Sequence, residues 1–152
     1  MKKFYTVILL PLLITASLAQ AIVIVPKAPN LDVVSYVLLD ADTGTIIASL
    51  DETTTVKPAS ITKLMTAYAT FQAIKEEQVR LDDPVKVSQR ASSIGGSTMF
   101  LNPYMDVTID DLLKGMIIVS GNDASVALAE HLAGSEETFA EYMNMYAEAL
   151  GL

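Results

Sequence analysis

The chain has 152 residues, 51% of them apolar, and a mean hydropathy of +0.40. This composition excludes a disordered chain and corresponds to about one domain. The net charge of −8 argues against nucleic acid or an anionic membrane surface as a partner. Because there is no cysteine, disulfides, a thiol nucleophile, cysteine-rich zinc sites and lipid attachment at a cysteine are all excluded.

Residues 1–21 have the pattern of a secretory signal peptide. Lys2 and Lys3 precede an uncharged run from Phe4 to Leu18, and the small-x-small sequence Ala19–Ala21 follows. The run is short for a membrane-spanning helix and contains Pro11, which favours a cleaved signal over an uncleaved anchor. We therefore expect an exported protein.

Residues 22–32 form an arm leading into the domain, which we place at residues 33–152. The β-branched runs Val33–Asp40 and Thr45–Leu50 flank a turn that ends at Gly44, which predicts a β-hairpin. A two-stranded hairpin is not stable alone, so it either packs on helices or joins strands that follow Leu152.

The segment Ser60–Ile74 has helical spacing of its apolar residues, and Lys63 is its only charged residue. A helix apolar on most sides is typical of a central, buried element. The residues with this spacing are Ile61, Leu64, Met65, Tyr68 and Phe71, and we expect Ile61, Leu64 and Met65 to form an apolar wall that desolvates Lys63.

The remaining elements follow from turn and capping signals. Leu81–Ser88 reads as a turn and a short strand, and Ser92–Ser97 as a loop. A capping box begins at Thr108 ahead of a helix through Leu112–Val119. Two more helices are expected, one from Asn122 to the stop at Gly134 and one from Ser135-Glu136-Glu137 to the stop at Gly151. The order predicts an α+β fold.

Ser60 and Lys63 lie one turn apart on the same face of the predicted helix. An amine serves as a base for a serine nucleophile only when its pKa falls from about 10.4. Burial and the positive end of a helix both favour the uncharged amine, and the Ser60 amide is one candidate oxyanion donor. The alternative is a capping serine with a solvated lysine, and the spacing alone favours this alternative.

The second candidate is Ser120-Gly121-Asn122, a hydroxyl and an amide on a tight turn between two apolar helices. Its alternative is an ordinary helix break in which Asn122 caps the next helix. The pairing of S-x-x-K with S-x-N about 60 residues later, in an exported chain, favours the catalytic interpretation.

These motifs resemble the serine penicillin-recognising enzymes, most closely the D-alanyl-D-alanine carboxypeptidases among the low-molecular-mass penicillin-binding proteins. The resemblance covers nearly all of the chain after residue 21. It implies an α+β fold, part of the transpeptidase fold shared by penicillin-binding proteins and β-lactamases. The matching strings are Val37–Gly44 (VLLDADTG), Lys57–Thr66 (KPASITKLMT), Gly96–Leu101 (GSTMFL) and Ser120–Ala124 (SGNDA).

The resemblance also implies roles for four residues. Ser60 would be the acylated nucleophile and Lys63 the base that takes its proton. Ser120 would relay a proton to the leaving amine, and Asn122 would bind the substrate backbone. The implied substrate is a peptidoglycan stem peptide ending in D-Ala-D-Ala, with β-lactams as covalent inhibitors and with no cofactor or metal.

The chain departs from the family pattern in two places. Pro103-Tyr104 stands where relatives usually have Pro-Gly, and no lysine after Lys114 provides the K-T-G motif that supplies an oxyanion donor in the family. We therefore expect residues 33–152 to be the N-terminal part of a catalytic domain whose later sheet strands are missing. Because losing one oxyanion donor costs a factor of about 10² to 10³, we expect little activity from this segment alone.

The resemblance implies a periplasmic location on the outer face of the inner membrane, with membrane association only through the missing C-terminal region. Three alternatives stay open: a β-lactamase, a D,D-endopeptidase and a non-catalytic cell-wall binding protein. His131, the only histidine, is expected on a helix surface and not in a triad. Five methionines are expected to fill the core: Met99, Met105, Met116, Met143 and Met145.

Overall fold

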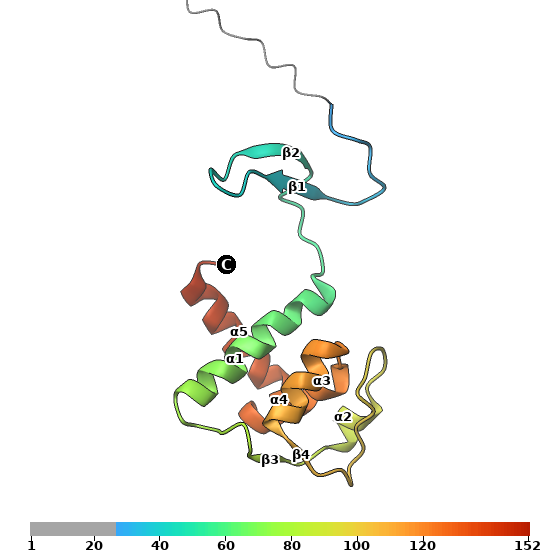
Figure 1. The fold of residues 1–152 in the computed structure, drawn as a ribbon, viewed down its shortest axis with the longest axis vertical. Coiled ribbons are helices and arrows are strands. Elements are labelled where there is room, and N and C mark those ends of the chain that lie inside the picture. The colour runs from blue at the N-terminus through green and yellow to red at the C-terminus, as the bar shows by residue number, and fades with distance from the viewer. Residues whose placement is uncertain (1–26) are drawn as a thin grey trace, which may run out of the picture. The chain divides into compact units, whose positions relative to one another are not determined.

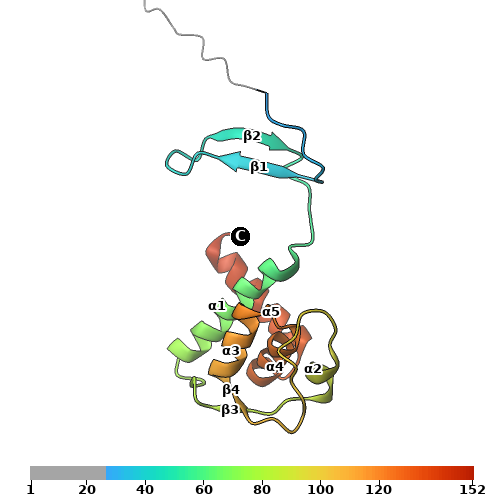
Figure 2. The ribbon, with the colours of Figure 1, turned by 45° about the vertical axis from the view of Figure 1, so that its right-hand side comes forward.

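The computed structural model describes residues 27–152, so the predicted signal peptide and the start of the arm lie outside the described residues. The chain divides into two compact units, an N-terminal unit up to Thr54 and a C-terminal unit from Thr55 to Leu152. Figures 1 and 2 show a hairpin in the first unit and a helical assembly in the second. Each unit is described by itself below.

The N-terminal unit contains the predicted hairpin. Strands β1 (Tyr36–Leu39) and β2 (Ile46–Leu50) pair antiparallel. The turn is closed by Asp40, whose carboxylate accepts hydrogen bonds from the Thr43 N–H at 2.8 Å and hydroxyl at 2.7 Å. Gly44 has a φ of +69°, the conformation for which a glycine is suited. The hairpin is thus confirmed, although its first strand begins three residues later than predicted.

The C-terminal unit is built around one helix, α4 (Asn122–Ala133), which packs against four others. Figure 1 shows these helices gathered in one body, with a two-stranded antiparallel sheet of β3 and β4 at its edge. The surrounding elements are η1 (Ala59–Ile61), α1 (Thr62–Lys75), β3 (Pro84–Val85), α2 (Gln89–Ser93), β4 (Val107–Thr108), α3 (Ile109–Ile118) and α5 (Glu136–Leu150).

The main core lies between α3 and α4 and is filled by large apolar side chains. Ile109, Leu112 and Leu128 are fully buried, and Met116 is 1% exposed. A smaller cluster joins α1, α4 and α5 through Ala69, Ala129 and Phe139. At its edge, Tyr68 and Tyr146 meet edge to face with ring centroids 5.5 Å apart, a favourable aromatic geometry. Burial of Tyr146 raises the pKa of its hydroxyl.

Four predicted helix ends are confirmed, in α3, α4 and α5. Thr108 and Asp111 form a reciprocal capping box at the start of α3, and the Ser135 side chain caps α5. Helices α4 and α5 end at Gly134 and Gly151, both in the left-handed conformation. These ends depend on local hydrogen bonds between near neighbours in sequence.

Three expectations from the sequence, about the central helix, the loop 92–97 and the methionines, are wrong or incomplete. Helix α1 is not the central helix, because its buried residues are small and its large apolar residues Leu64 and Phe71 are exposed. The predicted loop 92–97 begins inside helix α2, which ends at Ser93. Of the five methionines, Met116 is buried and Met99 and Met143 pack against core clusters, but Met105 and Met145 are exposed.

Between residues 27 and 152, no helix combines the length and apolar character that crossing a bilayer requires.

Candidate active site

Ser60 lies in the short 3-10 helix η1, which leads into α1. It is exposed to solvent, and the preceding Ala59 has a φ of +47°, unusual for a residue with a side chain. Such strained backbone is found at functional sites, where the surrounding structure holds it. Lys63 lies one turn further on, in the first turn of α1, and is half-buried.

The structure brings together all four predicted site residues. Lys63 Nζ lies 3.2 Å from Ser60 Oγ and 2.7 Å from Asn122 Oδ1. The Ser120 hydroxyl donates to Ser60 Oγ at 3.0 Å. Ser60 Oγ therefore has both an amine and a second hydroxyl within hydrogen-bond distance, an arrangement that can activate a serine hydroxyl chemically.

The turn between α3 and α4 presents Ser120 through an unusual backbone. Ser120 has a φ of +56°, and the next residue, Gly121, directly precedes α4. A Cβ at Gly121 would lie 3.0 Å from Asp123 Oδ1 and 3.3 Å from the Gly115 carbonyl oxygen. The middle position of S-G-N is thus too crowded for a side chain to fit without displacing its neighbours.

Asn122 does not cap α4, so the alternative interpretation of this residue is wrong. Its side-chain nitrogen donates to the Gly95 carbonyl oxygen at 2.8 Å, and its oxygen accepts from Lys63. Its backbone N–H donates to the Ser97 carbonyl oxygen at 2.7 Å. A Cβ at Gly96 would lie 2.6 Å from Asn122 Nδ2, so this loop also needs a glycine for close approach.

The apolar wall predicted around Lys63 is not closed. Ile61 is 67% exposed and Leu64 72% exposed. What the structure shows instead is a polar but uncharged contact set, because Lys63 Nζ bonds to a hydroxyl and an amide oxygen. None of the ion pairs formed by residues 27–152 includes Lys63. Within the described residues, the Lys63 amine is therefore not paired with a carboxylate.

A groove runs from the Ser60 cluster along α1 and α3. Apart from the polar residues at one end, its lining is apolar, and it is open to solvent. A ligand in this groove would have its polar atoms beside Ser60 and its apolar part on the two helices. The lining residues are Ser60, Lys63, Leu64, Ala67, Tyr68, Phe71, Met116, Ile117 and Ser120.

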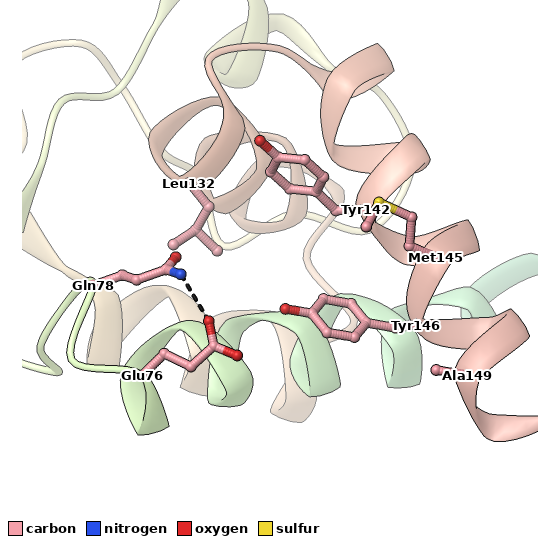
Figure 3. A pocket seen from close by; sticks show the side chains of 7 residues that line it. All are labelled: Glu76, Gln78, Leu132, Tyr142, Met145, Tyr146 and Ala149. Carbon is pink, nitrogen blue, oxygen red and sulfur yellow. Dashed lines mark hydrogen bonds between the residues drawn. The ribbon is translucent and has the colours of Figure 1, made fainter.

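A second pocket lies apart from this groove, where the C-terminal end of α1 meets α4 and α5. Figure 3 shows Tyr142 and Tyr146 on its α5 side and the Gln78 side chain donating to the Glu76 carboxylate on the other, at 2.7 Å. Leu132, Met145 and Ala149 complete the lining. None of the residues predicted for catalysis lines this pocket.

His131 is exposed in the last turn of α4, which confirms the prediction of a helix-surface histidine. It lines a shallow pocket with Lys86, Ser88 and Glu130 and does not line the Ser60 groove. Within the part of the chain that the structure describes, no group of three or more histidine or carboxylate side chains is arranged to hold a metal ion.

One residue of this region has no role in the sequence-based prediction. Asp123 follows Asn122 and is 1% exposed, and its carboxylate accepts backbone hydrogen bonds from the loop around Met99. Its position inside the string SGNDA was the available signal, but a carboxylate near the start of a helix is commonly a surface residue. Only the packing shows that it is buried.

Comparison with known proteins shows the family of the chain. The family model for D-alanyl-D-alanine carboxypeptidase matches residues 22–152. The chain belongs to this family. Among curated relatives, it is 43% identical over 118 residues to the D-alanyl-D-alanine carboxypeptidase DacF of Bacillus subtilis, covering 78% of this chain and 30% of the relative. It is 42% identical over 132 residues to DacC of Escherichia coli, covering 83% of this chain and 33% of the relative.

Solved structures of the family confirm the predicted fold class. The crystal structure of the carboxypeptidase DacD from Francisella tularensis matches with a TM-score of 0.73 and 37% identity, covering 87% of this chain and 32% of that one. Penicillin-binding protein 5 from Haemophilus influenzae matches with a TM-score of 0.73 and 38% identity. The match covers 84% of this chain and 38% of that one. The chain thus spans about a third of the length of these relatives.

Proposed function

We propose that the chain carries the nucleophile and base of a serine-type D-Ala-D-Ala carboxypeptidase that acts on peptidoglycan stem peptides. The observation that supports this most directly is the contact of Ser60 Oγ with Lys63 Nζ at 3.2 Å and with Ser120 Oγ at 3.0 Å. The relatives named above are carboxypeptidases of this specificity, which supports the same substrate class.

In the proposed mechanism the Lys63 amine accepts the Ser60 proton as Ser60 Oγ attacks the carbonyl carbon of the terminal D-Ala-D-Ala bond. A hydroxyl both donates and accepts, so the proton that Lys63 took from Ser60 passes through Ser120 to the leaving amine as the bond breaks and D-alanine departs, which leaves Lys63 able to accept a proton again. Water then hydrolyses the ester on Ser60 with Lys63 as the base. A β-lactam acylates the same hydroxyl.

Asn122 is proposed to hold the substrate backbone. Its amide already spans from the Gly95 carbonyl to Lys63, so it stands at the edge of the groove with a fixed orientation. The apolar lining along α1 and α3 provides a surface for the aliphatic part of the stem peptide. No cofactor and no metal takes part in these steps.

The remaining proposals concern the whole protein. We propose that residues 33–152 are part of a catalytic domain and that further sheet strands with a K-T-G motif supply the second oxyanion donor. Export through the N-terminal signal would place the enzyme in the periplasm, on the outer face of the inner membrane. Membrane association would then depend on a C-terminal region.

The test is covalent labelling of the chain with a fluorescent penicillin, followed by intact mass spectrometry after long incubation. The wild-type chain is expected to gain the mass of one penicillin, and Ser60→Ala to gain none. Ser93→Ala is the matched control, because Ser93 is an exposed serine on α2.

Three other outcomes would contradict the proposal. Binding of penicillin without a covalent adduct would favour a non-catalytic cell-wall binding protein. Rapid turnover of the penicillin would favour a β-lactamase, and cleavage of cross-linked peptides in preference to terminal D-alanine would favour an endopeptidase.

A further inference from the structure

A buried carboxylate lies directly behind the Ser120–Asn122 turn. Asp123 accepts hydrogen bonds from the Met99 N–H at 3.0 and 3.1 Å, from the Leu101 N–H at 3.0 Å and from the Ala124 N–H at 2.9 Å. It takes part in none of the ion pairs found between residues 27 and 152. A charge buried to this degree is tolerated only when hydrogen bonds replace its hydration, and here backbone N–H groups do so.

The loop of residues 95–101 is bent to present its N–H groups to this carboxylate. Phe100, between the two donors, has a φ of +62°. A residue in the left-handed conformation turns neighbouring N–H groups toward one side, which forms a concave binding site for an anion. This conformation costs free energy for a residue with a side chain, so the loop depends on Asp123 to hold it.

The same loop decides how the Asn122 amide is oriented. An amide group has a donor end and an acceptor end, whereas a carbonyl oxygen only accepts. The Gly95 carbonyl therefore binds the NH₂ end of Asn122, which directs Oδ1 toward Lys63. A second bond, from the Asn122 backbone N–H to the Ser97 carbonyl, fixes the loop at the same point.

We propose that Asp123 is a positioning residue for the site. By holding the loop through Met99 and Leu101, it keeps the Gly95 carbonyl in place and so fixes the side-chain orientation of Asn122 against Lys63. The effect of Asp123 on acylation rests on the proposed function, whereas its effect on Asn122 does not.

The test uses the full chain and the variant Asp123→Asn, which keeps the size of the side chain but offers an NH₂ group to N–H donors. In wild type we expect a single, slowly exchanging side-chain NH₂ resonance for Asn122. We also expect through-hydrogen-bond couplings from the Met99 and Leu101 amides to the Asp123 carboxylate carbon. In the variant, amide exchange at Met99 and Leu101 should be at least tenfold faster and the Asn122 resonance should shift.

Acylation of Ser60 by penicillin is the functional readout and should slow about 10- to 100-fold in Asp123→Asn, while amide exchange in α5 stays unchanged. The matched control is Asp110→Asn, which removes a carboxylate from the surface of α3, where it pairs with Lys114. This control should leave the Asn122 resonance unchanged and the acylation rate within twofold of wild type.

The two readouts separate the two proposals. A wild-type chain that is never acylated would contradict the proposed function, and the Asn122 resonance would still decide the role of Asp123. An unchanged Asn122 resonance in Asp123→Asn would overturn the positioning role. If Asp123→Asn does not fold, the wild-type spectra decide the positioning role of Asp123. Missing couplings or two orientations of the Asn122 amide would overturn this role, and the expected couplings with a single Asn122 resonance would support it.

Discussion

Helices α1 and α4 both carry residues of the site, but they bury different kinds of side chain. Helix α4 buries Val126 and Leu128 in the core, together with the carboxylate of Asp123. Helix α1 buries only small side chains and leaves Leu64 and Phe71 exposed. Small residues let α1 approach α4 closely, whereas α4 is surrounded by neighbours on several sides. An apolar composition therefore does not by itself show which helix is central.

The two halves of the site, one around Asn122 and one around Ser60, also differ in how they are held and in how exposed they are. The Asn122 half is held by main-chain and side-chain bonds to the loop and lies next to the core. The Ser60 half is exposed and is held mainly by its contacts with Lys63 and Ser120. We therefore expect substitutions in the Ser60 half to change chemistry with little effect on stability, and substitutions around α4 to change stability.

The largest effect is expected for Lys63→Met. Removal of a general base typically costs a factor of about 10² to 10⁴, so the rate of Ser60 acylation should fall about 10³-fold. The midpoint of thermal unfolding should change by no more than a few degrees. Mass spectrometry of the penicillin adduct over time measures the rate, and Lys75→Met, at the exposed C-terminal end of α1, is the control. Equal rates for the two variants would show that Lys63 is not the base.

The comparison of α4 with α1 is tested directly by Leu128→Ala and Leu64→Ala. Leu128 is fully buried and Leu64 is 72% exposed. We expect Leu128→Ala to lower the free energy of unfolding by about 2 to 5 kcal/mol, because it leaves a cavity. Leu64→Ala should change it by less than about 0.5 kcal/mol. Urea denaturation measures the free energy of unfolding of both variants. Similar losses would mean that Leu64 on α1 is buried in solution by contacts that the structure does not show.

A smaller effect is expected at the capping box of α3. Thr108→Ala removes a side chain that accepts from the Asp111 N–H at 3.2 Å and donates to the Asp111 carboxylate at 2.7 Å. Loss of an N-cap typically costs about 1 kcal/mol in the free energy of unfolding. The same denaturation experiment measures it. Thr138→Ala serves for comparison, because it leaves in place the N-cap hydrogen bond from the Thr138 N–H to the Ser135 side chain.

The smallest effect is the pH dependence of this cap. Hydrogen bonds from Thr108 lower the pKa of Asp111 in the folded chain. A lowered folded-state pKa means that the stabilisation is present above the unfolded pKa of about 3.9 and is lost as pH falls through the folded value. The stability difference between wild type and Thr108→Ala should therefore shrink between pH 5 and about pH 2. A difference that grows with acidification would contradict this assignment.

Much of the local structure was predictable because it depends on near neighbours in the sequence. The hairpin, the Thr108 capping box and the helix stops at Gly134 and Gly151 all appear where turn and capping rules place them. The grouping of Ser60, Lys63, Ser120 and Asn122 was also predicted, through the resemblance of two motifs to a known family.

What could not be predicted depends on which face of a helix meets a neighbour. The exposure of Ile61 and Leu64 follows from where α1 meets α4, not from their apolar character. The orientation of Asn122 and the burial of Asp123 depend on a loop that comes from more than 20 residues earlier in the chain.

The sequence by itself determined where α3, α4 and α5 begin and end and which residues carry reactive groups, because capping, turn chemistry and side-chain identity are local properties. Only the tertiary structure decided that Ser60 and Lys63 meet Ser120 and Asn122, about 60 residues away. That meeting requires α3 and α4 to pack beside α1, and it is the burial of their shared apolar surface that drives this packing.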